Sequence, residues 1–219
     1  MNLDTIPRKV KDLLQTQTEK RTQSQEPRVF VISDTHFFHK NINKYEPIRT
    51  QFNDCEQTMI NNWKRVVRPQ DIVYHLGDVA FGLKKNQEKL RSVLSQLPGY
   101  KILIRGNHDD ERVNFIDLGF DEVKEHEIID DLYLNHYPLV ESIYDDAKLK
   151  KLKKSRLSLC NEFEISTVIH GHVHSNRVKG TSIPHFNCSV ENINFTPILL
   201  TDAERQAQAN VCTDFKFDF

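Results

Sequence analysis

The sequence has little cysteine and glycine, almost no net charge, and no long apolar run. Its four cysteines stand far apart in 219 residues with no C-x-x-C pair, so no disulfide framework is expected. No stretch approaches the roughly 20 apolar residues of a membrane span. The polar start MNLDTIPRKVKDLLQ lacks the apolar centre of a secretory signal. We therefore expect a cytoplasmic protein with reduced thiols and no membrane partner.

Charge and composition are those of an ordinary soluble chain. The formal net charge is -1, with 38% hydrophobic and 28% charged residues, so no global basic character indicates a nucleic-acid partner. The length suits one substantial core.

The polar stretch TQTEKRTQSQEP before residue 28 lacks core-forming side chains. We expect residues 1–26 to form an appendage, either a short helix or a disordered tail, and residues 27–219 to form one domain.

From residue 28 the pattern alternates strands with helices. Strands are expected at 28–33, 71–76 and 101–105, and helices along 59–67, 83–97 and near 109–118. This order predicts parallel strands covered by helices. Five later apolar runs follow with little helix between them and predict a second sheet: 123–129, 132–137, 166–170, 186–190 and 196–200. The expected fold class is α/β, a four-layer-type α/β/β/α sandwich of two mixed sheets flanked by helices.

Polar side chains gather where five of these strands end. The sequences SDTHFFH, GDVAFG and GNHDD follow the first three strands, and NHYP and HGHVH end two later ones. Because ligands bind at the carboxyl ends of strands in open α/β sheets, these clusters should converge. Singly, each Asp or Asn fits turn or cap chemistry equally well. As a set they favour two metal ions that share a carboxylate. The candidate ligands are Asp34, His36, Asp78, Asn107, His136, His172 and His174.

Three of the seven glycines stand directly before candidate ligand residues. They are Gly77, Gly106 and Gly171. A backbone that turns sharply off a strand, or passes close to a bound ion, has no room for a Cβ atom. We expect these glycines to serve that purpose.

The ordered set D-x-H, G-D, G-N-H-D, H and G-H-x-H resembles the calcineurin-like metallophosphoesterase superfamily. The closer resemblance is to small bacterial and phage phosphoesterases that open with SDTHFFHKN and close with a segment like FNCSVE. The resemblance implies a dinuclear centre of Mn, Ni, Fe or Zn in the sandwich fold. One metal would be held by Asp34, His36 and His174. The other would be held by Asn107, His136 and His172, with Asp78 as the bridge.

The resemblance also implies a catalytic role for His108, as the non-ligand histidine beside the phosphate. His39 is expected either to bind substrate phosphate, together with Asn107 and His108, or to be a surface loop residue. Asp109 is expected either to orient His108 or to cap the following helix. We assign no function to His75, His126, His170 and His185.

The predicted reaction is hydrolysis of phosphate esters by a hydroxide that bridges two divalent metals. The substrate is expected to be a nucleotide or small phosphoester, as a monoester or a diester. The residues after G-D lack the arginine of the protein phosphatases, so a phosphoprotein is not favoured. Two alternatives stay open. One is a single-stranded nuclease that uses the basic stretch 148–156, KLKKLKKSR, which otherwise forms a solvated helix face. The other is a catalytically silent scaffold.

Overall fold

The computed structural model describes residues 26–139, 162–176, 178 and 183–214. The expected appendage, apart from residue 26, and the basic stretch 148–156 lie outside the described residues. No helix in these ranges has the length and apolar character needed to cross a membrane. Cys55 and Cys188 are free thiols.

The first sheet contains five strands in the order β4-β3-β2-β1-β9. Four of them run parallel: β1 (Val29–Ile32), β2 (Ile72–His75), β3 (Tyr100–Ile104) and β4 (Glu122–Lys124). The short β9 (Ile198–Leu199) pairs antiparallel with β1. Central strand residues such as Val31, Val73 and Leu103 are fully buried, as expected for β-branched and aliphatic strands covered on both faces.

Helices connect the parallel strands of the first sheet. α3 (Cys55–Val66) follows the N-cap Asp54, whose side chain accepts a hydrogen bond from the backbone N–H of Gln57, and α4 (Leu83–Leu94) precedes β3. The buried Trp63 donates its indole N–H to the carbonyl of Pro98 at 2.9 Å, which fixes α3 against the start of β3. Both helices were predicted. Two short elements were not: α2 (Ile42–Tyr45) and the 3-10 helix η2 (Pro47–Gln51).

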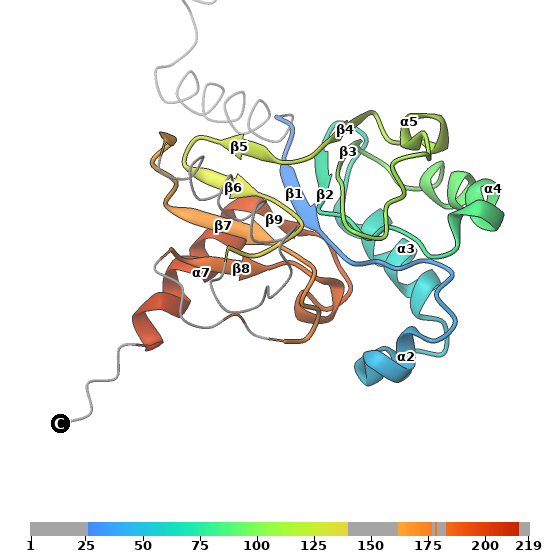
Figure 1. Ribbon diagram of the computed structural model, residues 1–219, viewed down its shortest axis with the longest axis horizontal. Coiled ribbons are helices and arrows are strands. Elements are labelled where there is room, and N and C mark those ends of the chain that lie inside the picture. The colour runs from blue at the N-terminus through green and yellow to red at the C-terminus, as the bar shows by residue number, and fades with distance from the viewer. Residues whose placement is uncertain (1–25, 140–161, 177, 179–182, 215–219) are drawn as a thin grey trace, which may run out of the picture.

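The second sheet has the order β5-β6-β7-β8. Its strands are β5 (Glu127–Ile129), β6 (Leu132–Leu134), β7 (Thr167–His170) and β8 (His185–Asn187). β5 is antiparallel to β6, and the other pairs are parallel. Leu134 and Ile169 face the main core. Tyr133 and Val168 form a smaller cluster on the other face. Figure 1 shows the two sheets side by side, with α3 and α4 on the side of the first sheet. The predicted α/β fold of two mixed sheets flanked by helices is confirmed.

Three details of the expected fold are wrong. The run 123–129 is not one strand, because it is divided between β4 in the first sheet and β5 in the second. The strand expected at 196–200 joins β1 in the first sheet. The helix expected near 109–118 is only the single turn α5 (Phe115–Leu118). The crossing between β4 and β5 carries no Gly or Pro, so the sequence does not mark it.

The C-terminal helix was missed as well. α7 (Leu200–Asp214) contacts β1, β7, β8 and β9, and therefore touches both sheets. Its buried positions include Leu200, Ala203 and Ala207. Alanines allow close packing but contribute little hydrophobic contrast, so the helical period was hard to recognise in the sequence.

The amino-terminal edge of the first sheet is tied together by the buried carboxylate of Asp71. It accepts hydrogen bonds from the backbone N–H groups of Arg28 and Arg68, at 3.0 and 2.8 Å, and from both guanidinium groups. The start of β1 and the turn after α3 are thereby joined to the start of β2. Burial raises the pKa of Asp71, but the hydrogen bonds from Arg28 and Arg68 outweigh it and hold the pKa well below its ordinary value.

We predict that Asp71→Asn lowers the free energy of unfolding by about 2 kcal/mol at pH 7, because it removes a buried charge with several charged donors. Since the folded-state pKa is depressed, this stabilisation is complete above the ordinary Asp pKa of about 3.9 and shrinks as the pH falls below it. Urea unfolding of parent and variant at pH 7 and pH 3 measures both effects. Glu88→Gln, which removes an exposed partner of Arg91, is the control and should change little. An equal difference between parent and Asp71→Asn at the two pH values would contradict the prediction.

Candidate metal centre

The loops that follow β1 and β2 continue to pair with each other after the strands end. The backbone N–H groups of Asp34 and His36 donate to the carbonyls of Gly77 and Asp78, both at 3.0 Å. The loops after β3, β6 and β7 reach the same edge, where Gly171 N donates to the carbonyl of His136 at 2.9 Å. The side chains expected to bind metal are therefore carried by backbone that is fixed by hydrogen bonds.

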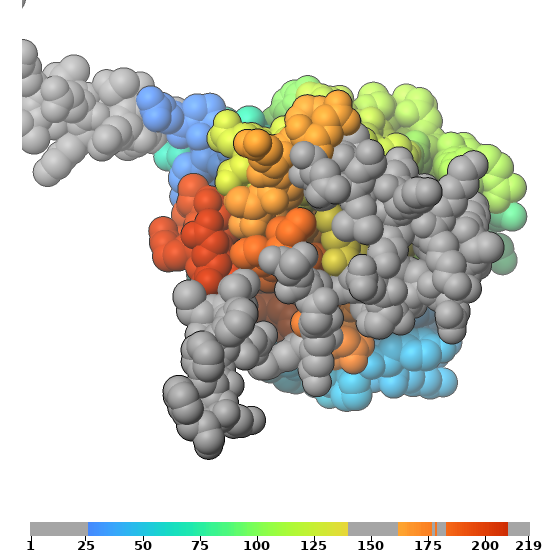
Figure 2. All heavy atoms as spheres, turned by 60° about the vertical axis from the view of Figure 1, so that its left-hand side comes forward, coloured from blue at the N-terminus to red at the C-terminus, as the bar shows by residue number. Residues whose placement is uncertain are grey.

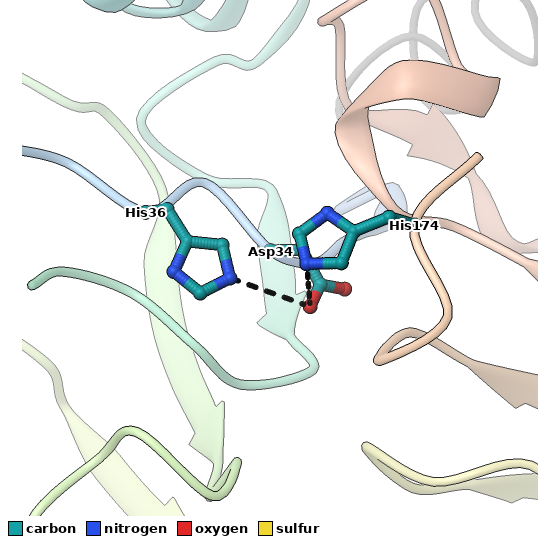
Figure 3. Close-up of side chains that lie close together, drawn as sticks. All are labelled: Asp34, His36 and His174. Atoms are coloured by element: carbon teal, nitrogen blue, oxygen red, sulfur yellow. Dashed lines mark ion pairs between the residues drawn. The ribbon is translucent and has the colours of Figure 1, made fainter. Parts of the chain in front are cut away.

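Asp34 is the centre of a first group of candidate ligands. Its Oδ1 atom lies 3.9 Å from Nε2 of His36 and 3.7 Å from Nε2 of His174. Figure 3 shows both imidazole rings directed at this one carboxylate oxygen. These three ligand atoms lie within 4.8 Å of one another, so one cation can reach all of them. This is the first group that the resemblance implied.

A second group surrounds His136. Its Nε2 atom lies 3.0 Å from Oδ1 of Asn107 and 3.2 Å from Nδ1 of His172. The opposite ring nitrogen, Nδ1, lies 2.7 Å from the carbonyl of Leu76, which fixes the ring orientation and leaves Nε2 toward the group. The structure thus brings together an amide oxygen and two imidazole nitrogens from three separate loops.

Asp78 lies between the two groups. Its Oδ2 atom is 3.6 Å from Nε2 of His36 and also 3.6 Å from Nε2 of His136. Asp34, Asp78 and His136 likewise have ligand atoms within 4.8 Å of one another. Both carboxylates therefore lie close to the place where the two groups of candidate ligands meet. All seven residues expected to bind metal are brought to one site.

The backbone at this site is held in a conformation that ordinary residues rarely adopt. Ten described residues other than glycine have positive φ, and half of them are candidate ligands. Such conformations cost of order 1–3 kcal/mol each and persist only where the surrounding structure imposes them. The five are Asp34 (59°), His36 (47°), Asp78 (56°), His172 (71°) and His174 (50°).

Buried ligand atoms without partners indicate that the residues fit a metal. Asp34 Oδ1 and His36 Nε2 have no hydrogen-bond partner in the described part of the chain, although burying such atoms unpaired is costly. Burial lowers the pKa of His36 to about 3 and that of His172 to about 4. Both rings are therefore neutral near pH 7, which is the form that binds metals. A set of carboxylate, amide and imidazole donors suits divalent cations of the first transition row and zinc.

The two carboxylates have opposite pKa shifts. Burial raises the pKa of Asp34, but the neighbouring His136, His174 and His36 hold it well below the ordinary range. Burial raises the pKa of Asp78 to about 6, and the negative charges of Asp34 and Asp109 act in the same direction. The attraction of His136 opposes this rise but does not cancel it. Asp78 is therefore the carboxyl whose negative charge is least compensated by the protein. A cation beside it would supply that compensation.

Two of the three glycines approach these carboxylates closely. A Cβ atom on Gly171 would lie 2.3 Å from Oδ2 of Asp34, and a Cβ atom on Gly106 would lie 2.3 Å from Oδ1 of Asp78. The expectation that these positions have no room for a Cβ atom is confirmed. At Gly106 the space is taken by the candidate ligand Asp78, and at Gly171 it is shared by Asp34 and Ser33, whose Oγ would lie 2.0 Å away.

His108 lies at the mouth of the site. Its backbone N–H donates to Oδ1 of Asp78 at 2.8 Å, while its ring Nε2 stands 4.0 Å from Oδ2 of the same residue. The side chain is 46% exposed, in contrast to the buried Asp78. The imidazole is thus within reach of both the carboxylate and a molecule arriving from solvent.

Asp109 holds two turns of the site together. Its oxygens accept hydrogen bonds from the backbone N–H groups of Asp78, Val79 and Gly106 at 2.8–3.0 Å. The expected helix cap is wrong, because α5 begins only at Phe115 and is capped by Asn114. Asp109 instead joins the G-D turn to the G-N-H-D turn and orients the backbone of Asp78. The expectation that it orients His108 stays a prediction.

His39 lies beside the candidate ligands but faces aromatic rings. The centre of its ring is 5.8 Å from that of His36 and 4.2 Å from that of Phe81. Burial, with the nearby His108 and Arg49, lowers the pKa of His39. The ring of His39 thus packs among aromatic side chains, and the phosphate contact that the sequence suggested stays a prediction.

Three histidines without an assigned function have packing roles. His75 Nε2 lies 2.9 Å from the hydroxyl of Thr35. His170 Nδ1 donates to the carbonyl of Gly171 at 2.8 Å, and its ring packs edge-on against His185. Burial lowers the pKa of His170 to about 3, so a neutral ring is favoured.

A buried ion pair that was not predicted lies behind the first group. Arg49 is 2% exposed, and its guanidinium lies 2.6 Å from Oε1 of Glu191. It also donates to the backbone carbonyls of Asp34 and Thr35 at 2.7 and 2.9 Å. The same Glu191 oxygen is 3.3 Å from Nδ1 of His174. The pair therefore fixes both the Asp34 loop and the ring of His174.

The sequence signal for this pair was weak. Glu191 belongs to the closing FNCSVE segment, but an acidic residue there has several ordinary uses. Arg49 stands alone in a polar stretch and is 142 positions from its partner. Because burial of arginine is rare, the pair could be recognised only in the folded structure.

We predict that Glu191→Gln weakens divalent-cation binding about 10- to 100-fold, as is typical for the hydrogen-bond partner of a metal-binding histidine. The amide keeps the volume but loses the charge that orients His174. Titration calorimetry with Mn²⁺ on metal-stripped protein measures the affinity. Glu127→Gln, a partly buried glutamate paired with Lys124, should bind Mn²⁺ like the parent. Undiminished affinity in a folded Glu191→Gln protein would disprove the role in positioning His174.

Comparisons with known proteins find a family model and several relatives that match this chain. The family model of the calcineurin-like phosphoesterase superfamily domain matches residues 28–187. An uncharacterised protein of Methanocaldococcus jannaschii is 34% identical over 184 residues, which cover 79% of this chain and 87% of that protein. The gene 66 protein of Mycobacterium phage L5 is 35% identical over 77 residues, or 35% of this chain and 37% of that one.

A solved structure shares the fold. The crystal structure of a protein of unknown function from Aquifex aeolicus superposes with a TM-score of 0.68 at 31% identity, covering 83% of this chain and all of that one. These relatives identify no substrate. The match of the family model to most of the chain, with the two groups of candidate ligands inside it, shows that the chain belongs to the calcineurin-like phosphoesterase superfamily.

Proposed function

We propose that the protein hydrolyses phosphate esters at two divalent cations held by the seven candidate ligands. The observation that carries the proposal is the position of Asp78 Oδ2, 3.6 Å from one imidazole of each group. One oxygen between two groups of nitrogen and oxygen donors is the arrangement that two cations sharing a carboxylate require. The candidate metals remain Mn, Ni, Fe and Zn, since all four accept imidazole and carboxylate ligands.

Different residues of the chain would bind the two cations and act on the substrate. Asp34, His36 and His174 would hold one cation, Asn107, His136 and His172 the other, and Asp78 both. When bound, the cations would neutralise charge on a phosphoryl group and lower the pKa of a water nucleophile. His108, half-exposed at the mouth, would donate a hydrogen bond or a proton to an ester or phosphoryl oxygen.

The proposed substrate is a nucleotide or another small phosphoester, cleaved as a monoester or a diester. A supporting observation is that the described ligand set is complete, which a catalytically silent scaffold would not need. Binding partners other than the substrate are not required for this chemistry.

We predict that metal-stripped protein is inactive and regains phosphoesterase activity with at least one of Mn²⁺, Ni²⁺, Fe²⁺ or Zn²⁺. The measurement is release of p-nitrophenolate from p-nitrophenyl phosphate and bis-p-nitrophenyl phosphate, with nucleotides assayed in parallel. Preference for one of the two chromogenic esters separates monoesterase from diesterase. If every metal fails with every ester, the scaffold alternative replaces the enzyme.

We also predict that His108→Asn lowers kcat about 10²- to 10⁴-fold, the usual range for loss of general acid catalysis, while two metal equivalents remain bound. Asp78→Asn is the matched variant, because Asp78 contacts His108 but is assigned to the metals. It should lose metal as well as activity. Elemental analysis and kinetics on both proteins separate the two roles. A metal equivalent missing from His108→Asn would make His108 a ligand.

A further inference from the structure

A row of rings leads from the candidate metal centre to the protein surface. The ring of His108 lies 6.2 Å from that of Phe81, and Phe81 lies 4.2 Å from His39, measured between ring centres. Beyond His39 the ring of Tyr45 follows at 6.2 Å, tilted by only 6° from the His39 plane. We call His39, Tyr45 and Phe81 the aromatic face. Its inner end adjoins the candidate ligand His36.

The aromatic face is exposed to solvent. Tyr45 is 71% exposed and Phe81 is 44% exposed. They are two of the four exposed aromatic side chains in the described ranges; the others are Tyr100 and Phe163. In Figure 2 the light-blue segment that contains α2 lies open at the lower edge of the molecule. Single exposed aromatic residues are common, but adjacent ones beside a reactive site indicate a binding surface.

The backbone beneath the aromatic face is fixed by the same pairing that carries the ligands. Phe37 and Ala80 form a bridge between the two loops, and the N–H of Phe81 donates to the carbonyl of Phe37 at 2.8 Å. The carbonyl of Phe81 accepts from the side chain of Asn86 at 3.0 Å. The N–H of Ile42 donates to the carbonyl of His39 at 3.0 Å. The backbone that carries Phe81 and His39 is thus fixed relative to the candidate metal centre.

We propose that the aromatic face binds the base of a nucleotide whose phosphate lies at the metal centre. This inference rests on the proposed phosphoesterase function and names the substrate class for the same site. A flat base has π faces that stack on exposed rings, whereas a sugar phosphate or an aliphatic phosphoester has none.

Stacking of a base on these rings should have a measurable effect on binding affinity. Loss of one stacking ring typically weakens binding about 5- to 100-fold. The probes are two phosphonates that cannot be hydrolysed, in which a methylene group replaces the 5′ ester oxygen of adenosine monophosphate or of ribose 5-phosphate. Titration calorimetry on the Mn²⁺-loaded full chain gives a Kd for each, and the ratio of the two isolates the base.

We predict that the parent binds the adenosine phosphonate at least about tenfold more tightly than the ribose phosphonate. Tyr45→Ser and Phe81→Ser should each reduce this ratio about fivefold or more, while Phe81→Trp, which keeps a stacking ring, should preserve it. Tyr100→Ser is the matched control, because Tyr100 is 43% exposed but begins β3 at the opposite edge of the sheet. It should keep the parental ratio.

The outcomes separate the two proposals. Equal affinity of the parent for both phosphonates, or a parental ratio in both serine variants, overturns the aromatic face as a base site. Turnover of p-nitrophenyl phosphate and methyl p-nitrophenyl phosphate, a monoester and a diester without a base, is measured independently. Absence of turnover of both esters with every metal counts against the phosphoesterase function alone. A mononucleotide and the strand of a nucleic acid share this chemistry. Pentadeoxyadenylate binding that is much tighter and steeply salt-dependent would identify the strand as the source, whereas affinity close to that of the adenosine phosphonate identifies the mononucleotide.

Discussion

The backbone pairing between the loops after β1 and β2 is the constraint on which the site depends. The register of the two parallel strands continues beyond their ends, so that Asp34, His36 and Phe37 are bonded in turn to Gly77, Asp78 and Val79. Parallel pairing normally ends where loops diverge. Here it continues into the ligand segments, and it fixes two carboxylates and an imidazole on one side and the aromatic face on the other. A shift in this register would displace the candidate ligands and the aromatic face together.

The carboxylates on these two loops are supported differently, which explains their opposite pKa shifts. Asp34 Oδ2 accepts hydrogen bonds from the backbone of His172 and the hydroxyl of Ser189, both at 2.9 Å, and histidines surround its other oxygen. Asp78 faces Asp34 and Asp109 across a buried site and has a raised pKa. Neighbouring anions are tolerated in a protein interior only with compensation. Divalent cations would provide this compensation without a protein cation entering the site.

Sequence reasoning succeeded where the local pattern determines the structure. Five polar motifs after five apolar runs were sufficient to place Asp34, Asp78 and Asn107 at one edge of the fold, because the carboxyl ends of parallel strands meet there. It failed where only tertiary packing decides. The alanine stripe of α7, the unmarked crossing between β4 and β5, and the pairing of Arg49 with Glu191 across the chain have no local periodicity or turn signal.

The roles of His39 and Asp109 show a second limit. Both stand within ligand motifs, so proximity in sequence suggested contact with phosphate or with His108. The folded geometry assigns Asp109 to three backbone N–H groups, because those donors converge on one point between two turns. His39 is turned toward Phe81 and Tyr45. Motif membership therefore places a residue near the chemistry, but its hydrogen-bond partners decide its role.

The strained backbone and the buried ion pair together explain how the site is kept in place before a cation binds. Five candidate ligands with positive φ would relax if their loops were free. Arg49 opposes this at the first loop, since its guanidinium holds two successive carbonyls, those of Asp34 and Thr35, while Glu191 holds the guanidinium. Asp109 does the same for the turn that carries Asp78. Because the fold maintains this strain, a cation would lose little of its binding free energy to rearranging the loops, and the geometry of the site would be set by the hydrogen bonds behind it.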